Sequence, residues 1–191
     1  IARQIMVRTC HDALVDCDYG GKRGILLIRR DANPAKGYLW PLGGFYDRGL
    51  ELLETEQDFG VGSLTSRIKK ESGLDIDPDS VIKLGSARMM WKETPYQKGK
   101  EQPLPPEIED TPESRKLWKI FIQHLENNLP AGIDDFGVLF YCKSSGNLKL
   151  DFLHKDPVIV TPDMYGPSFR NSLHPYVSHG MDRAIKLINH E

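Results

Sequence analysis

The sequence has few cysteines, no long apolar run and almost no excess of charge of either sign. Its three cysteines, Cys10, Cys17 and Cys142, lack the spacing of a metal cluster, so reduced thiols in the cytosol are the simplest interpretation. No apolar stretch is long enough to span a membrane, and no signal peptide opens the chain. A net charge of −2 gives no electrostatic basis for general nucleic-acid binding. These absences predict a cytoplasmic protein that binds neither membranes nor nucleic acids.

The chain is long and apolar enough for one domain with a sizeable core. It has 191 residues, of which 39% are hydrophobic. Residues 3–17 alternate loosely, and the turn sequence Asp-Tyr-Gly-Gly at 18–21 leads to an apolar strand at 24–29, which predicts a hairpin. Further strands are expected at 81–91, 136–143 and 148–153, the last two joined as a second hairpin by the turn at 144–147.

Helical signals occur in three places, at 63–72, from Asp110 to about residue 127, and at 177–189. In the second, Asp110 is the expected N-cap, followed by a proline and a glutamate. That helix is expected to bury Leu117, Ile120, Phe121 and Leu125. Because strands and helices do not alternate regularly, the sequence predicts a mixed α/β sandwich with a curved sheet between the first and last helices. Insertions into this single domain are expected near 50–62 and 95–130.

The stretch from Arg29 to Leu74 combines a strand that ends in arginines, a double glycine and a helix that carries Glu71. Gly43 and Gly44 let the backbone approach a ligand closely, because neither has a Cβ. Such a turn beside a helix carboxylate is suited to a metal-bound pyrophosphate, since backbone groups and side chains converge on it. The stretch is therefore the candidate functional site.

The same stretch resembles the Nudix hydrolase superfamily. The Nudix box opens with a glycine, matched by Gly44, and closes with a pattern matched by Glu71-Ser72-Gly73-Leu74. The middle of the box differs. Leu50 stands in place of its first glutamate, and its later Arg, Glu and Glu are replaced by Ser66, Arg67 and Lys70. The run at 30–38, R-D-A-N-P-A-K-G-Y, looks like the GDP-mannose mannosyl hydrolase branch, as do H-K-D at 154–156 and T-P-D at 161–163. That branch also keeps only the late glutamate of the box.

The resemblance implies a Nudix-like α/β/α sandwich and a set of roles at the site. Arg30 would bind a diphosphate, and Glu71 with the Gly43 carbonyl would hold one Mg²⁺, or Mn²⁺ in its place. His154 would be the catalytic base, since a histidine accepts a proton from water at neutral pH. The implied ligand is a small nucleotide or a nucleotide sugar.

Several residues keep two interpretations. Arg67 lies one turn before Glu71, which predicts a surface ion pair, yet Arg67 or Lys70 would also neutralise a diphosphate. The acidic run at 51–58 is a solvated face or a source of further metal ligands, with Asp47 as a weaker candidate. Trp40 and Tyr38 pack beside the sheet or stack on a base. His11 is expected to be a partly buried histidine bonded to the backbone.

Three functions are therefore compatible with the sequence. The first is a hydrolase of a nucleoside diphosphate sugar or a related compound, the second an ordinary Nudix pyrophosphatase that attacks phosphorus, and the third a non-catalytic binding or regulatory module. The base, the sugar and the bond cleaved stay open. The oligomeric state stays open as well, and a homodimer is compatible with the sequence.

Overall fold

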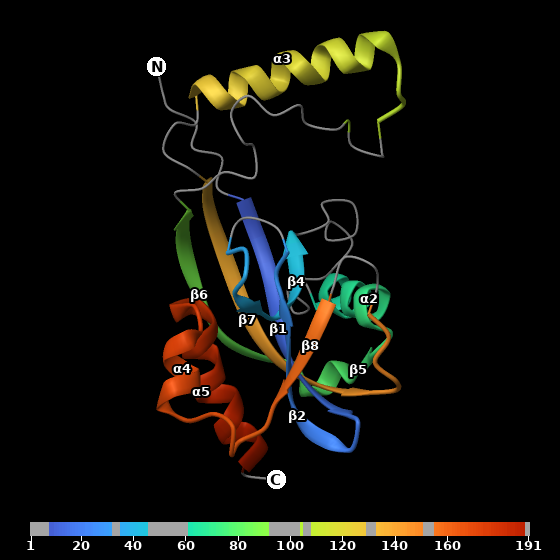
Figure 1. Cartoon of the computed structure of the whole chain (residues 1–191). Coiled ribbons are helices and arrows are strands. Elements are labelled where there is room, and N and C mark those ends of the chain that lie inside the picture. The colour runs from blue at the N-terminus through green and yellow to red at the C-terminus, as the bar shows by residue number, and fades with distance from the viewer. Residues whose placement is uncertain are drawn as a thin grey trace.

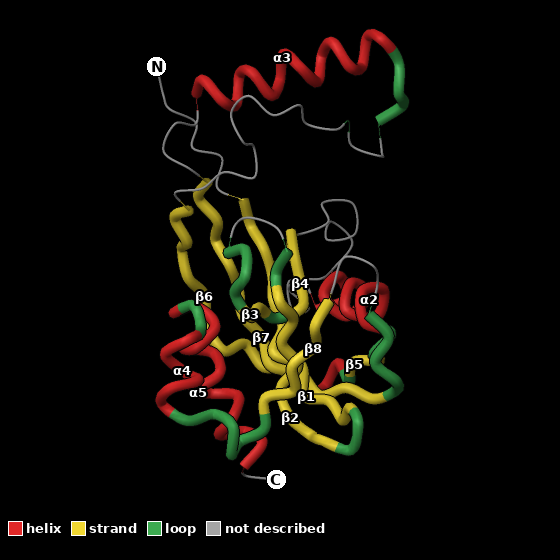
Figure 2. Tube along the Cα trace, in the orientation of Figure 1, coloured by secondary structure: helices red, strands yellow, loops and turns green. Residues whose placement is uncertain are grey.

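The described strands form one eight-stranded mixed sheet around strand β1 (Arg8–Tyr19). The computed structural model describes residues 8–31, 35–45, 61–91, 104, 108–128, 133–150 and 155–189. The other strands are β2 (Lys22–Arg29), β3 (Leu39–Trp40), β4 (Leu42–Phe45), β5 (Asp75–Ile76), β6 (Ile82–Trp91), β7 (Ile133–Ser145) and β8 (Lys155–Val160). Figure 1 shows their arrangement, and Figure 2 the division into helices, strands and loops.

Strand β1 pairs with three neighbours. It runs parallel to β7 along most of its length, antiparallel to β4 over residues 10–13 and antiparallel to β2 over residues 15–19. The β1–β2 hairpin turns at Gly20 and Gly21, whose φ angles of +61° and +73° explain why glycines stand there, and this hairpin is confirmed. At the outer sides of the sheet, β8 and β3 pair with β2, while β6 and β5 pair with β7.

Helices cover both faces of the sheet, as the sequence predicts. Helix α2 (Val61–Ser72) packs Leu64 and Ile68 against one face, where they meet the odd-numbered side chains of β1. Helix α5 (Pro175–Asn189) packs Val177, Met181, Ala184 and Ile185 against the other face, together with Leu14 of β1. The predicted α/β sandwich is therefore confirmed. A turn of 3-10 helix (η1, Pro78–Ser80) follows β5.

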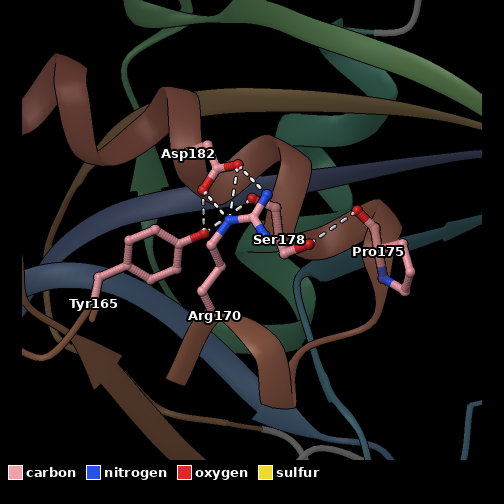
Figure 3. Close-up of polar contacts among 5 residues, drawn as sticks. All are labelled: Tyr165, Arg170, Pro175, Ser178 and Asp182. Atoms are coloured by element: carbon pink, nitrogen blue, oxygen red, sulfur yellow. Dashed lines mark hydrogen bonds and ion pairs between the residues drawn. The ribbon is translucent and has the colours of Figure 1, made fainter. Parts of the chain in front are cut away.

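The start of α5 is held in place by a polar network with the short helix α4 (Pro167–Ser172), shown in Figure 3. Arg170 donates to both carboxylate oxygens of Asp182, from Nη2 to Oδ2 at 2.7 Å and from Nε to Oδ1 at 2.8 Å. Tyr165 donates to Asp182 Oδ1 at 2.7 Å and also lies 3.0 Å from the Ser178 carbonyl. The hydrogen bonds from Arg170 hold the pKa of Asp182 below its usual range. This network fixes the first turns of α5, which carry residues of the functional site.

The second predicted hairpin is wrong. Of the predicted partner strand at 148–153, residues 148–150 are not a strand and residues 151–153 lie outside the described residues. Strand β7 pairs in parallel with β1 and antiparallel with β5 and β6 instead. The strand that follows is β8, which pairs with β2. The apolar strand was thus found correctly, whereas its partners β1 and β6 lie far away in the chain, β1 by more than 100 residues.

Helix α3 (Pro112–Asn128) also departs from expectation. Leu117, Ile120 and Phe121 were expected to be buried but are 63%, 54% and 45% exposed, because α3 lies apart from the sheet (Figure 1). The N-cap is Thr111, whose Oγ1 accepts from the Ser114 amide at 3.0 Å. Asp110 instead forms an ion pair with Arg115 at 2.6 Å. The side chain of Leu125 lies outside the described residues.

The three cysteines are buried free thiols, as predicted. Burial raises the pKa of Cys17 to about 12 and raises that of Cys142 further. No helix in the described part of the chain is long and apolar enough to cross a membrane.

Candidate functional site

The double glycine lies on β4, opposite two polar residues of β1. Gly43 faces Asp12 in the ladder and Gly44 faces His11. Gly43 has a φ of +148°, and a Cβ there would lie 2.2 Å from the His11 carbonyl oxygen and 2.7 Å from the Asp12 Cα. A Cβ on Gly44 would lie 2.8 Å from Arg67 Nη1 on helix α2. Only a glycine at position 43 therefore permits this close packing of β4 against β1, whereas at position 44 a Cβ would require the Arg67 side chain to move.

On the α2 side of the sheet, Glu71 points inward. The residue is only 9% exposed, and its Oε2 atom is buried. Its Oε1 atom lies 3.5 Å from Arg67 Nη1, one helical turn away. Arg67 is half-buried and contacts the Gly44 side of β4, so the helix brings both an acid and a guanidinium to the double glycine.

On the α5 side, Asp12 is the centre of a second group of residues. It is 4% exposed and accepts a hydrogen bond from the Tyr176 hydroxyl at 3.1 Å. Burial raises the pKa of Asp12 to about 7, while hydrogen bonds from Tyr176 and Trp40 and the charge of Arg30 act in the opposite direction. The charge of Glu71 raises it further, so the carboxylates from the two faces lie within electrostatic reach of each other.

An aromatic cluster completes this side. The Trp40 ring stacks on Tyr176, with centroids 5.6 Å apart, and lies 5.4 Å from the His174 ring. The Arg30 guanidinium lies 5.5 Å from the centroid of Trp40, a cation–π contact that positions its charge. Trp40 is buried, in keeping with a packing role, whereas Tyr38 is 45% exposed and meets His174 edge-on at 6.0 Å.

The structure brings most of the predicted site residues together around β4 and β1. Arg67 lies against Gly44 and 3.5 Å from Glu71, and the charges of Arg30 and Glu71 both act on Asp12, which faces Gly43. Lys70 is exposed on α2, away from the inward face of that helix. His154, Asp47 and the acidic run at 51–58 lie outside the described residues, so their roles stay predictions.

Asp12 was missed from the sequence. Its only signal was a carboxylate beside a histidine within an otherwise apolar strand. His11, expected to be partly buried, is fully buried. Burial first and the charge of Arg67 second lower its pKa to about 4, so this imidazole is neutral at physiological pH.

The oxygen donors at the site are chemically suited to a hard divalent cation, because carboxylate and carbonyl oxygens are the ligands that Mg²⁺ prefers. The set is incomplete, however. No group of three His, Cys, Asp or Glu residues that could hold a metal occurs in the described ranges. Glu71 also has a guanidinium 3.5 Å from one of its oxygens. The pair that the sequence predicts as ligands, Glu71 and the Gly43 carbonyl, stays a prediction and would need further ligands to hold an ion.

The sheet has one helix layer on each face, which defines an α/β/α sandwich. The candidate site lies beside β4, where helix α2 brings a carboxylate to the double glycine. Such a sandwich is the fold of the Nudix hydrolases, as solved structures show. The MutT protein from Methanosarcina mazei matches with a TM-score of 0.53 at 13% identity, over 98% of this chain and 99% of that one. A MutT NUDIX hydrolase from Burkholderia pseudomallei matches with a TM-score of 0.50 at 14% identity, over 91% of this chain and 96% of that one.

A third solved structure is longer than this chain. A MutT/nudix family protein from Enterococcus faecalis matches with a TM-score of 0.47 at 15% identity, over 80% of this chain but only 43% of its own length. No protein-family model matches the sequence, and no curated protein matches it either. The likeness therefore lies in the fold.

The pH dependence of stability is expected to contain two opposing contributions. Folding raises the pKa of Asp12 from 3.8 to about 7, so the folded state holds the extra proton and stability falls as pH rises through this range. Folding lowers the pKa of His11 from 6.5 to about 4, so the unfolded state holds the extra proton and stability rises with pH between these values. Each slope is at most about 1.4 kcal/mol per pH unit.

Urea denaturation between pH 4.5 and 7 separates the two contributions. In Asp12→Asn, the free energy of unfolding should rise more steeply with pH than in the unmodified protein, because only the His11 contribution remains. In His11→Gln, the free energy of unfolding should fall with pH relative to the unmodified protein, because only the Asp12 contribution remains. Identical slopes in the two variants would contradict the assignment of these groups.

Proposed function

We propose that this chain is a Nudix-type hydrolase of a nucleoside diphosphate-linked compound, with nucleoside diphosphate sugars as the expected class. One observation carries the proposal. Arg67 lies against Gly44 and 3.5 Å from the buried carboxylate of Glu71, while Arg30 lies over Trp40 and its charge acts on Asp12, which faces Gly43 in the β1–β4 ladder. Paired guanidiniums beside exposed backbone suit a diphosphate, because they form charge-assisted hydrogen bonds with its oxygens.

In the proposed mechanism, Arg30 and Arg67 bind the diphosphate beside β4. His154 accepts the proton of the attacking water. The water oxygen bonds to the sugar carbon, the bond from that carbon to the diphosphate oxygen breaks, and the nucleoside diphosphate leaves. A divalent ion bound through Glu71 and the Gly43 carbonyl would supply neutralisation of the leaving group. Attack at phosphorus instead would release two monophosphates.

The ion pair between Arg67 and Glu71 favours a second candidate. A guanidinium near the only acid of α2 stands where a catalytic site would place a metal. The protein would then be a non-catalytic nucleotide-binding or regulatory module that keeps the Nudix fold. The two candidates agree on the ligand and differ in turnover.

A substrate panel distinguishes these functions. The protein is incubated with nucleotide sugars and dinucleotides, with and without Mg²⁺ or Mn²⁺, and the products are separated by ion-exchange chromatography. Free sugar plus nucleoside diphosphate is the expected result and requires the metal. Two monophosphates would indicate a pyrophosphatase. Binding without turnover of any compound would overturn the hydrolase and leave the binding module.

A further inference from the structure

A polar cavity of about 310 Å³ lies between the loop at 35–38 and the end of helix α4. Its volume is close to the lower limit of roughly 300 Å³ for small-ligand sites. Its residues come from the end of β2, from this loop, from the start of β3 and from the last residue of α4. They are Arg29, Lys36, Gly37, Tyr38, Leu39 and Ser172. The proposed function uses none of them.

The charged groups of this cavity are cations. The Arg29 Nη1 atom donates to the Gly37 carbonyl at 2.8 Å, which holds the guanidinium at the loop through one of its five N–H groups. Lys36 lies 4.0 Å from Asp31, but the two side chains are 63% and 73% exposed, so solvent screens this ion pair. None of the described residues that line the cavity is acidic. The cavity is therefore suited to an anion.

The pairing of β2 with β8 adds to this positive charge. Lys155 stands directly opposite Arg29 in the antiparallel ladder, beside the irregularity between Leu27 and Arg29. Two like charges at directly opposed positions disfavour the pairing of strands. An anion bound in the cavity offsets this repulsion, so the register of the two strands favours a negatively charged ligand.

The loop at 35–38 connects the cavity to the neighbouring Arg30. The Arg30 amide donates to the Tyr38 carbonyl at 3.0 Å, and the Gly37 amide donates to the Arg30 carbonyl at 2.9 Å. Ala35 has a φ of +62°, which is unfavourable for a residue with a Cβ and is retained mostly where the surrounding structure enforces it. These contacts hold the loop in one shape beside Arg29 and Arg30.

We propose that this cavity binds a phosphate group, at a site separate from the diphosphate site proposed at Arg30 and Arg67. The planar fork of Arg29 pairs with two phosphate oxygens at once, and the Lys36 ammonium adds a second charge. The phosphate is either free inorganic phosphate or a monoester carried by the nucleotide ligand, since both offer the same oxygens. The inference concerns binding alone and does not require that the protein hydrolyses its ligand.

Two substitutions remove the proposed contacts without touching the core. Arg29→Gln removes the guanidinium, whereas Lys36→Gln removes the ammonium and leaves the hydrogen bond from Arg29 to the loop in place. Both side chains are exposed. Lys83→Gln is the matched control, because Lys83 is an exposed lysine of β6 that does not line the cavity. Melting temperatures check that the three variants fold.

The test is isothermal titration with inorganic phosphate in the absence of divalent metal. Arg29→Gln should weaken the binding by at least about tenfold, the effect of one hydrogen bond to a charged group. Lys36→Gln should weaken it by about threefold, as expected of an exposed charge, and Lys83→Gln should leave it unchanged. Arg67→Gln tests the diphosphate site as the alternative location. Binding that is lost in Arg67→Gln but unchanged in Arg29→Gln and Lys36→Gln would overturn the inference, as would equal affinity in all variants or no binding at all.

NAD and NADP distinguish the two sources of the phosphate, because they differ only by a monoester at the ribose 2′ position. If the ligand carries the phosphate, NADP should bind more tightly than NAD, and Arg29→Gln should remove the difference. If the phosphate is free, the two dinucleotides should bind equally while inorganic phosphate still requires Arg29. Each of these results supports the site. Hydrolysis is not measured here, so a failed substrate panel is a separate result.

Discussion

Glu71→Gln is expected to reduce metal-dependent hydrolysis by at least about 100-fold. Loss of a residue that only supports a metal ligand already reduces activity by up to about 100-fold, and Glu71 is proposed to bind the metal directly. The amide has nearly the shape of the carboxylate but lacks its charge, and one of its two oxygens is replaced by a donor. A buried, uncharged group would attract neither a divalent cation nor the Arg67 guanidinium 3.5 Å away. The measurement is turnover as a function of Mg²⁺ concentration.

Asp75→Asn is the control for this variant. Asp75 is an exposed carboxylate just beyond the end of α2 and accepts from Lys69 at 2.7 Å, so its loss removes an acid near the helix without touching the site. Turnover and Mg²⁺ dependence should be unchanged. If Glu71 serves only to hold Arg67, then Glu71→Gln would lower the melting temperature and leave turnover per folded molecule intact. That result would refute the role proposed for Glu71.

Gly43→Ala is expected to lower the free energy of unfolding by about 3 kcal/mol, from backbone strain and overpacking together. The φ angle of +148° is one that side chains rarely adopt, and the added Cβ would lie 2.2 Å from the His11 carbonyl oxygen. Because β1 and β4 form a ladder there, relief requires the strands to separate. This is a large part of a typical total stability of roughly 5–15 kcal/mol, and urea denaturation measures it.

Gly44→Ala provides the contrast to Gly43→Ala. Its φ is not in the left-handed region, and the nearest atom to its Cβ is Arg67 Nη1, the far end of a flexible side chain. The variant should therefore remain close to full stability while Arg67 moves and diphosphate binding weakens. Equal destabilisation by both substitutions would show that the packing of β4 differs from the one described.

The positions where sequence-based prediction failed share one physical cause. Periodicity marks which side chains of an element are apolar, but it does not say what covers them. The apolar stripe of α3 is exposed for this reason, although the helix itself was predicted closely. Likewise the strand at β7 was recognised, but the assumption that it turns back on its neighbour failed, because its pairing with β1 is parallel and non-local.

The amino-acid sequence alone determined the local features. These are the β1–β2 hairpin with its two glycines and helices α2 and α5, because each depends on backbone preferences or on periodicity within one short stretch. Only the tertiary structure decided the role of Asp12. Its partners Arg30, Trp40, Glu71 and Tyr176 come from four separate segments, and burial among them is what raises its pKa. Burial depends on the assembled sheet and helices, which no local pattern encodes.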